Sequence, residues 1–362
     1  MKTIKKIGVL TSGGDAPGMN AAVRAITDKA IEQGIEVVGI LGGYSGLIND
    51  KIIPLTNEFV NGIVGLGGTK IYSDRCVEFK TEEGMAKAIA TCKKHGIDAL
   101  VAIGGDGTFR GATDMSLRGI PTVGVTGTID NDITATDYTV GFDTAMNTVL
   151  GAVERFKDTC ESHARCNVIE VMGRDCGQIA LMTAIASGAI AVVIPEIEFN
   201  EQEALDRIRT ARANGTRGLI VIVSEGVYHT DENGEKVHYG EYFAKRIEAE
   251  TGVETKFARL AHMVRGGHPT LRDRLTASRM GVCAVELLIE GKSNLVVVEE
   301  DGRYVPYDIV FALTTDRMYK NKLKEGDLDR YSEEELAKMK AICDKRREEI
   351  KELYKVANDI AI

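Results

Sequence analysis

The stretch KIGVLTSGGDAPGMN, residues 6–20, carries the clearest fold signal in the chain. An aliphatic run at residues 6–10 enters a turn with three glycines, and a helical pattern follows from about residue 20 to residue 33. A strand that passes through a glycine turn into a helix is typical of parallel α/β sheets. Glycines also let a phosphate approach backbone N–H groups, and a helix N-terminus adds positive potential. The stretch matches neither a Walker loop nor GxGxxG, so it predicts either an anion-binding corner or a plain strand–helix connection.

The same strand–turn–helix pattern recurs through most of the chain. Further strands are predicted at residues 35–41, 99–103, 122–125, 167–171, 191–194 and 219–223. Apolar strands that alternate with helices indicate parallel sheets covered on both faces, which bind ligands at the carboxyl ends of their strands. A helical pattern over about residues 144–162 predicts a long helix that crosses between two lobes.

Length and composition limit the class of protein. The 362 residues suffice for about two α/β domains, and 44% hydrophobic with 27% charged residues is an ordinary globular composition. Because 54 Asp and Glu outnumber 45 Lys and Arg, for a net charge of −9, we expect neither nucleic acid nor a membrane as partner. No apolar run reaches the roughly 18 residues of a transmembrane helix, and the one near Met1 is too short for a secretory signal. Seven scattered cysteines without a CxxC pair predict reduced thiols and a cytoplasmic location.

A second glycine turn, IGGDGT at residues 103–108, follows a predicted buried strand. Glycines flank Asp106 on both sides, so its carboxylate can reach a Mg²⁺ ion whose shell is completed by water and phosphate oxygens. GGDGT also occurs in lipid kinases and NAD kinases. The turn therefore indicates a nucleotide phosphate without naming the acceptor, and the alternative is a structural turn.

A third motif, GTIDND at residues 127–132, places two carboxylates close together in the sequence. In an extended segment, Asp130 and Asp132 would point to the same face and line one cleft. One carboxylate can accept the proton of an attacking hydroxyl, while the other organises a metal directly or through water. Asx-rich turns are common, so the motif on its own more often marks a capped loop.

Basic residues in glycine-containing or polar segments form a fourth set. Arginine forks bind phosphate oxygens bidentately, and a histidine adds a further donor. Any one of them is more often a surface ion-pair partner, but together they suit a complex with two phosphorylated ligands. The set comprises Arg75, Arg165, Arg174, Lys256, His262 and Arg265.

The order of these motifs is similar to that of the 6-phosphofructokinases. The chain contains, in sequence, TSGGDAPGMNAAVR, IGGDGT, GTIDND, DYTVGFDTA, EVMGR and HxxRGGxP, and the resemblance spans residues 5–313. It implies an α/β fold of two Rossmann-like lobes, each a mainly parallel sheet sandwiched by helices, with the active site in the cleft between them. It also implies the committed step of glycolysis (EC 2.7.1.11). In that reaction the γ-phosphate of Mg-ATP passes to the 1-hydroxyl of fructose 6-phosphate, giving fructose 1,6-bisphosphate and ADP.

The resemblance assigns roles to individual residues. Asp130 becomes the general base and Asp106 the Mg²⁺ contact, with Thr128, Arg174 and Asp132 as further catalytic residues. Gly14, Arg75, Cys76, Gly105, Asp106, Gly107 and Thr108 would surround the nucleotide. Thr128, Ile129, Asp130, Met172, Gly173, Arg174 and Glu225 would face the sugar. His262 and Arg265 would hold the 6-phosphate, joined by Arg165 and Lys256 from a neighbouring subunit of a homo-oligomer, expected to be a tetramer.

Domain boundaries are predicted from the order of the motifs. Residues 1–140 with about 255–305 would form the nucleotide lobe, and about 141–254 with 306–320 the sugar-phosphate lobe. About residues 321–362 are expected to be a charged helical extension. Its many Lys, Arg and Glu with thin apolar spacing predict a solvated helix on the surface or at a subunit contact.

Two glycines, Gly107 and Gly127, indicate which phosphoryl donor the protein uses. Pyrophosphate-using relatives carry Asp where Gly107 stands and Lys where Gly127 stands, and an Asp would oppose the α-phosphate of ATP. The sequence therefore favours ATP. The alternatives are a pyrophosphate-dependent enzyme of the same fold, a non-catalytic sugar-phosphate-binding regulatory subunit, and, from GGDGT alone, a lipid or NAD kinase.

Other positions depart from the family pattern. Lys256 stands where Arg is usual and lacks the bidentate fork; Arg259 could compensate in part, although an odd offset in a strand points it to the other face. At the effector site, Arg24 remains and Lys157 replaces an Arg. Asp28, Asn57, Ile190, Asn214, Thr216 and Gly218 stand where charged or His groups would be expected, so an acidic residue and neutral residues replace cations. We therefore expect weak or absent control by ADP and phosphoenolpyruvate.

Overall fold

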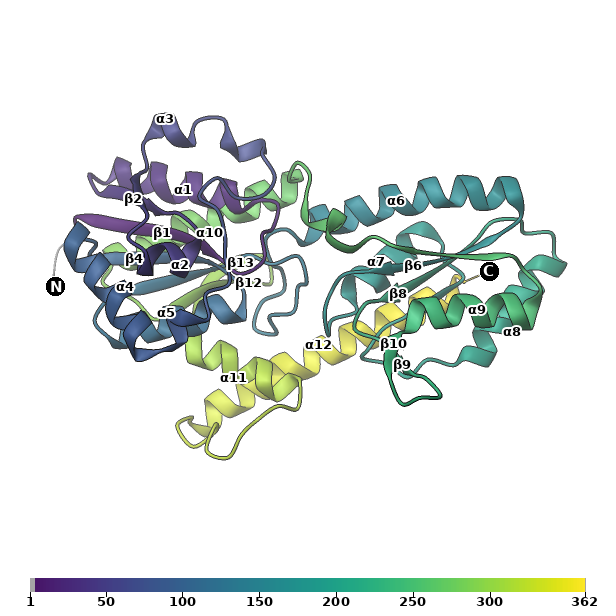
Figure 1. Ribbon diagram of the computed structural model, residues 1–362. Coiled ribbons are helices and arrows are strands. Elements are labelled where there is room, and N and C mark those ends of the chain that lie inside the picture. Colours follow the sequence, from purple (N-terminus) through teal and green to yellow (C-terminus); the bar gives the residue numbers. More distant parts are fainter. Residues whose placement is uncertain (1–3, 362) are drawn as a thin grey trace. The chain divides into compact units, whose positions relative to one another are not determined.

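The computed structural model describes residues 4–361, and its contacts divide them into two compact units. Unit 1 holds the chain up to Ile129 together with Ile133–Thr144 and Arg265–Cys343. Unit 2 holds Asp130–Asp132, Ala145–Val264 and the chain from Asp344 onward. Each unit is an α/β structure built on its own sheet, as the sequence predicts (Figure 1).

Unit 1 is built on a seven-stranded sheet in the order β13-β12-β5-β4-β1-β2-β3. The inner strands are parallel, and the edge strands β3 and β13 pair antiparallel to their neighbours. All residues of β4 and β5 are buried, which agrees with helices on both faces. The strands are β1 (Lys6–Ser12), β2 (Glu36–Ile40), β3 (Ile52–Pro54), β4 (Ala99–Gly104), β5 (Thr122–Thr126), β12 (Leu295–Glu300) and β13 (Arg303–Asp308).

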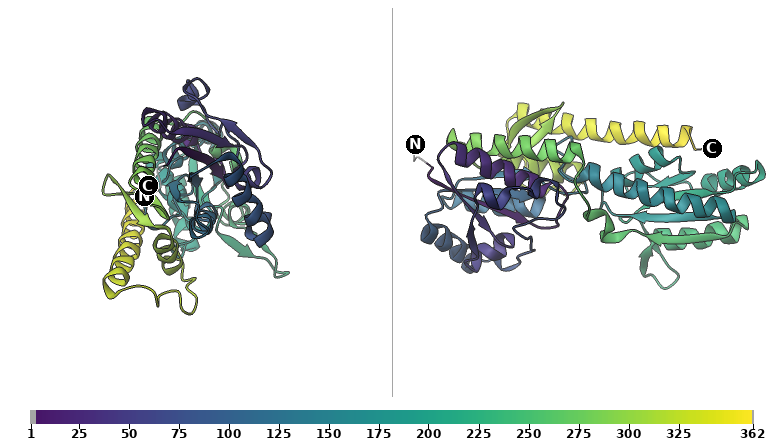
Figure 2. Two further views of the ribbon diagram at one scale, coloured as in Figure 1. Left: turned by 90° about the vertical axis from the view of Figure 1, so that its left-hand side faces the viewer. Right: turned by 90° about the horizontal axis from the view of Figure 1, so that it is seen from above.

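Helices cover both faces of this sheet. On one face the apolar core joins Leu100 and Ala102 of β4 to Phe109 and Ala112 of α5. The other helices of unit 1 include α1, which packs along α10 (Figure 2). The longer helices are α1 (Met19–Glu32), α4 (Glu82–His95), α5 (Asp106–Leu117), α10 (Leu271–Ile289) and α11 (Ile309–Tyr319); α2 (Gly43–Ile48) and α3 (Asn57–Val60) are short.

The DYTVGFDTA motif is held by one buried carboxylate of α10. Asp273 is fully buried and accepts hydrogen bonds from the Tyr138 hydroxyl, the Gly141 N–H and both the N–H and hydroxyl of Thr144. Four donors on two oxygens satisfy this buried charge and fix the turn that leads into α6 (Phe142–His163).

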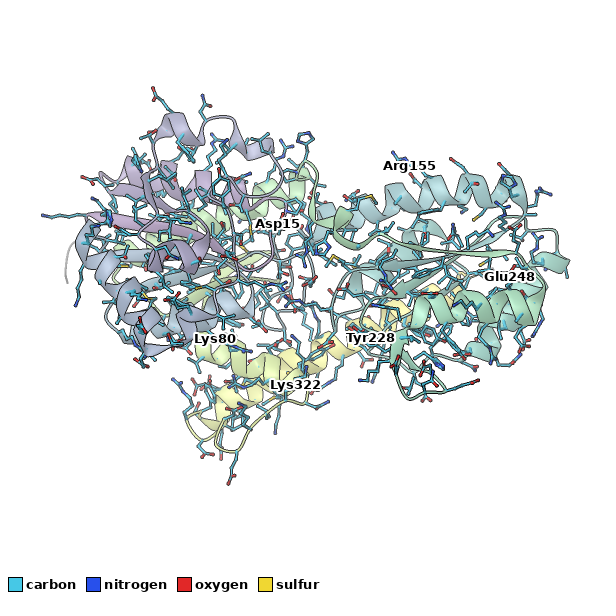
Figure 3. All side chains as sticks on the ribbon, viewed as in Figure 1. Asp15, Lys80, Arg155, Tyr228, Glu248 and Lys322 are labelled. Carbon is cyan, nitrogen blue, oxygen red and sulfur yellow. The ribbon has the colours of Figure 1, made fainter. Side chains whose placement is uncertain are left out.

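Unit 2 contains a four-stranded parallel sheet in the order β11-β6-β8-β7. Its strands are β6 (Cys166–Val171), β7 (Ala191–Val193), β8 (Leu219–Ser224) and β11 (Thr255–Arg259). Around them lie α6, α7 (Gln178–Ser187), α8 (Glu201–Ala213) and α9 (Tyr239–Thr251), with α8 packed against α9 (Figure 1). A small hairpin, β9 (Tyr228–Thr230) and β10 (Lys236–His238), follows β8; Tyr228 is labelled on it in Figure 3.

The observed units differ from the predicted domain boundaries in several places, and one of them is Asp130–Asp132, which belong to unit 2 and not to the predicted nucleotide lobe. Residues 255–264 belong to unit 2, because β11 pairs in parallel with β6 from Thr255↔Cys166 onward. Residues 306–320 belong to unit 1, because β13 pairs with β12 and α11 packs on α5.

Residues 321–362, predicted to be a charged helical extension, do not form a unit of their own. Helix α12 (Glu333–Asp359) has a buried stripe at helical spacing, formed by Met339, Cys343, Arg346, Ile350 and Ala357. Its residues up to Cys343 belong to unit 1, where Met339 joins the apolar core, and those from Asp344 belong to unit 2. The helix is therefore mostly exposed, but a few apolar residues at the right spacing bury one stripe of it.

All seven cysteines are free thiols. Within residues 4–361, no helix is both long enough and apolar enough to cross a membrane.

Candidate active site

Two glycine corners lie next to each other in unit 1. The first joins β1 to α1 and contains Asp15, labelled in Figure 3; the second joins β4 to α5. The Thr108 hydroxyl donates to the Ser12 carbonyl at 2.9 Å and ties the corners together. A Cβ at Gly104 would lie 2.3 Å from Thr108 Oγ1 and 2.5 Å from the Ser12 oxygen, so this approach requires glycine. The carboxyl ends of two neighbouring strands thus carry adjacent glycine turns, each leading into a helix N-terminus.

A segment sixty residues further along the chain packs against the first corner. The Gly13 N–H donates to the Asp74 carbonyl at 3.1 Å, and the Ser73 hydroxyl donates to the Gly13 carbonyl at 2.8 Å. These bonds bring Arg75 and Cys76 beside the glycines. Arg75 is exposed, whereas Cys76 is half-buried against the apolar core.

Arg265 also belongs to this corner. Its guanidinium is buried and donates through Nη1 to the Asp15 carbonyl at 3.3 Å. A Cβ on Gly14 would lie 2.7 Å from the same Nη1, so Gly14 leaves the space that the guanidinium occupies. His262, predicted to share a phosphate with Arg265, is exposed and belongs to unit 2.

Asp106 is the first residue of α5 and follows Gly105, the N-cap. Its side chain is 19% exposed, and Lys320 Nζ lies 4.0 Å from its Oδ2 and 2.9 Å from Asp316 Oδ2. Lys320 was not predicted as a site residue; the i,i+4 spacing from Asp316 is its only local signal. A Cβ at Gly107 would meet nothing within 4 Å. The corner thus pairs one accessible carboxylate with open space and a nearby cation.

This corner fits Mg²⁺ bound through a nucleotide. The described part of the chain contains no group of three His, Cys, Asp or Glu side chains that could enclose a metal. Mg²⁺ commonly binds one or two carboxylates while substrate phosphates and water supply the remaining oxygens. Asp106 meets that requirement as a single carboxylate beside open space.

The two carboxylates of GTIDND lie in unit 2 and face one guanidinium. Arg174 Nε is 3.3 Å from Asp130 Oδ2, and its Nη1 is 3.8 Å from Asp132 Oδ2. The Asp130 and Asp132 side chains are 1% and 9% exposed, whereas that of Arg174 is 51% exposed. Arg174 can therefore meet both carboxylates and still reach a ligand.

The predicted extended conformation of this segment is wrong. Asn131 has φ +48°, in the left-handed region, and the chain turns at residues 129–130. Asparagine is among the few residues that tolerate this region. The carboxylates share a partner because of this turn and not because of strand alternation. Ile129, predicted to face the sugar, has a fully buried side chain, so only its backbone is available.

Glu225, directly after β8, shapes the turn that follows β6. Its Oε1 accepts hydrogen bonds from the N–H of Gly173 at 3.2 Å and of Arg174 at 2.9 Å. Gly173 has φ +152°, and a Cβ there would lie 2.4 Å from the Cys176 carbonyl, so the turn requires glycine. Met172, before it, is largely buried. Glu225 therefore fixes the backbone from which Arg174 reaches the two aspartates.

Arg165 and Lys256 lie together at the amino ends of the strands of the unit 2 sheet, whereas Arg174 and Glu225 follow the carboxyl ends. Arg165 Nε lies 2.8 Å from one oxygen of Glu254, and Lys256 Nζ lies 3.0 Å from the other. The hydrogen bond from Arg165 is the main reason that the pKa of Glu254 lies below its usual range, and the hydrogen bond from Lys256 adds to this shift. Both cations lie at the amino ends of β6 and β11, one strand length of about 20 Å from Arg174. Within unit 2, they therefore lie at the end of the sheet opposite to that of Arg174 and Glu225.

Arg259 pairs with Glu170, whereas Lys256 pairs with Glu254. The Arg259 Nε lies 2.7 Å from Glu170 Oε1, and His238 Nδ1 lies 3.3 Å from the other oxygen. Glu170 is 2% exposed, and burial raises its pKa despite these two neighbours. Arg259 is thereby engaged in neutralising a buried carboxylate.

At the expected effector position, both Arg24 and Lys157 have partners. Arg24 Nε lies 3.1 Å from Asp28 Oδ2, and the Asn57 amide donates to Asp28 Oδ1 at 3.0 Å. In unit 2, Lys157 donates to the Ser187 carbonyl at 3.2 Å.

Comparisons with known proteins identify the family. The family profile described as "Phosphofructokinase" matches residues 6–288. The chain is 50% identical over 312 residues to the ATP-dependent 6-phosphofructokinase of Bacillus subtilis, covering 86% of this chain and 95% of the relative. It is 47% identical over 322 residues to ATP-dependent 6-phosphofructokinase 1 of Clostridium perfringens, covering 89% and 98%.

Solved structures agree with this relationship. Phosphofructokinase from Saccharomyces cerevisiae superimposes with a TM-score of 0.80 at 32% identity, over 90% of this chain and 47% of the yeast chain. A pyrophosphate-dependent phosphofructokinase from Marinobacter aquaeolei, at 23% identity and a TM-score of 0.69, shares the fold over 84% of this chain. The chain described here belongs to the phosphofructokinase family.

Proposed function

We propose that this chain transfers the γ-phosphate of ATP to the 1-hydroxyl of fructose 6-phosphate, giving fructose 1,6-bisphosphate and ADP. Asp130 accepts the proton of the hydroxyl as its oxygen bonds to the γ-phosphorus. The bond to the β,γ-bridging oxygen breaks, and its electron pair leaves with ADP. The observation that carries the proposal is the buried Asp130 carboxylate 3.3 Å from a half-exposed Arg174, on a turn fixed by Glu225.

The remaining residues act by position and charge. Phosphoryl transfer depends on alignment and charge neutralisation more than on covalent help. Arg174 can stabilise charge on the moving phosphoryl group, as can Arg75 and Thr128. The backbone N–H groups of the glycine corners and the positive ends of α1 and α5 suit the nucleotide phosphates. Mg²⁺ would be held by Asp106 and would neutralise phosphate charge when bound.

The choice of ATP over pyrophosphate rests on Gly107 and Gly127. The space around Gly107 is open, and no carboxylate stands there to repel an α-phosphate. ³¹P NMR of the purified protein with fructose 6-phosphate and either donor tests this choice. Formation of the bisphosphate with ATP, at a rate at least tenfold above that with pyrophosphate, is expected. The reverse preference would favour the pyrophosphate-dependent alternative, and no product with either donor would favour a non-catalytic subunit.

We also propose that Arg165 and Lys256 serve the site of another subunit, in a homotetramer. Their position at the amino edge of the unit 2 sheet supports this, because Arg174 and Glu225 follow the carboxyl ends of the same sheet. Mixing two inactivated variants tests this proposal. Asp130→Ser chains and Arg165→Ser/Lys256→Ser chains should each be inactive or weak alone. Hybrids should regain up to about a quarter to a half of parental activity if the cations act in trans. No recovery in hybrids verified by mass would refute the proposal. A cytoplasmic location stays a prediction.

A further inference from the structure

We infer that Arg346 of helix α12 is a positioning residue for the Asp130–Asp132 turn; this inference rests on the proposed role of Asp130. The family profile ends at residue 288, so α12 lies outside the part of the chain that it matches. Arg346 and the Asp130–Asp132 turn belong to the same unit.

The Arg346 guanidinium is bound to the backbone between the two carboxylates. Its side chain is buried in the otherwise largely apolar stripe of α12, and Nη2 donates to the carbonyl oxygen of Asn131. A buried charge is costly unless it is well bonded, so an arginine kept here implies a specific partner. That partner is the carbonyl of the residue flanked by Asp130 and Asp132.

Asn131 is held from two sides. Its Nδ2 donates to Gln178 Oε1 of α7 at 2.6 Å, while its carbonyl accepts from Arg346 of α12. With φ at +48°, Asn131 adopts a conformation that non-glycine residues rarely keep without support from their surroundings. Two tethers from different helices supply that support. The orientation of the carboxylates on either side therefore depends on both tethers.

The charge on Arg346 also acts on the buried groups around this turn. Burial raises the pKa of Glu196, and its hydrogen bond from the Gly177 N–H and the Arg346 charge oppose that shift. Burial likewise raises the pKa of the Cys176 thiol to about 12, again opposed by Arg346. Arg346 thus places a positive charge near the half-buried Glu196, the buried Cys176 and a backbone carbonyl, which agrees with a defined position for its side chain.

The helix that presents Arg346 is anchored to unit 2 on the C-terminal side of this residue. Ile350 and Ala357 are buried, and the Asn358 side chain accepts from Arg207 of α8 at 2.8 Å. Positioning groups act best when their own rotamers are fixed by packing. Arg347, the next residue, is 41% exposed and pairs with Asp344 at 3.1 Å, so it offers a matched control on the same helix.

The test compares Arg346→Met with Arg347→Met in steady-state kinetics. Displacing catalytic groups by about 1 Å can cost about 100-fold in rate. We expect kcat of Arg346→Met to fall about 10- to 100-fold, with KM for both substrates within about threefold of the parent and Arg347→Met unchanged. Hydrogen exchange should accelerate in peptides covering residues 127–134, again only in Arg346→Met. A kcat within threefold of the parent, or an equal loss in Arg347→Met, would overturn the inference.

A second variant covers the case in which Arg346→Met does not fold. Arg346→Lys keeps the charge and a donor but loses the planar fork. It should fold and show a kcat about 3- to 10-fold below the parent, and parental kcat would overturn the inference. Asp130→Ser is measured in parallel. If Asp130→Ser stays active, the proposed base assignment fails; if only the Arg346 variants stay active, the positioning role alone fails.

Discussion

Gly226→Ala tests how strictly the position of Arg174 controls the reaction. A Cβ on Gly226 would lie 2.0 Å from the Arg174 carbonyl oxygen and 3.0 Å from its carbonyl carbon. In proteins a Cβ atom essentially never lies closer than 3.0 Å to another residue's heavy atom. Because the added Cβ would lie 2.0 Å from the Arg174 oxygen, the Arg174 turn must move by at least about 1 Å. The neighbouring atoms are backbone, which cannot rotate away as a side chain does.

The displacement has a direct consequence for the proposed chemistry. Glu225 holds the N–H groups of Gly173 and Arg174, and Arg174 Nε lies 3.3 Å from Asp130 Oδ2. A shift of about 1 Å would lengthen that pair beyond ion-pair range and would cost about 100-fold in kcat/KM for fructose 6-phosphate. A coupled assay of ADP release at saturating ATP measures it.

The control for this variant is Gly151→Ala in α6. There the added Cβ would meet only the end of the flexible Arg155 side chain, at 3.5 Å, and alanine favours the helix. Its activity should equal that of the parent. If Gly226→Ala keeps kcat/KM within threefold of Gly151→Ala, the Arg174 turn does not control the reaction and the reasoning is refuted.

Three further predictions follow from other parts of the structure. Gly107→Asp should fold normally, because the space is open, yet lower kcat/KM for ATP about 100-fold relative to pyrophosphate; an unchanged donor ratio would contradict the donor argument. Adding ADP or phosphoenolpyruvate should shift half-saturation by fructose 6-phosphate less than threefold, because Asp28 pairs with Arg24, and a tenfold shift would contradict this. Burial raises the pKa of Glu196 above 4.5, so its contribution to the free energy of unfolding is present below pH 4.5 and is lost as pH rises through the raised pKa. Urea unfolding should therefore show Glu196→Gln gaining stability relative to the parent between pH 4.5 and pH 7, and a constant difference would contradict the shift.

The sequence predicts the parts of this fold that depend on local signals. Strands β1 and β4 and the corners that follow them were predicted from glycine turns after apolar runs, and the structure has them. Strand β11, TKFAR, was not predicted, because it is an edge strand with exposed polar positions. The antiparallel edge strands β3 and β13 were not predicted either, because their pairing depends on neighbours distant in sequence.

For the candidate site too, the sequence predicts only the part that depends on local signals. Motifs identified the residues, but their geometry depends on contacts that no motif contains. The turn at Asn131 is held by Gln178 and Arg346, which are 47 and 215 residues away. The charged composition of α12 hides its buried stripe, so Arg346 could not be distinguished from the many basic residues around it.

The most direct measurement is the turnover of Asp130→Ser against the parent, with Mg-ATP and fructose 6-phosphate in a coupled assay. Loss of a general base should lower kcat about 10²- to 10⁴-fold and leave KM for the sugar phosphate nearly unchanged. A variant that turns over at the parental rate would show that another group removes the proton of the hydroxyl, and the account of this site would be wrong.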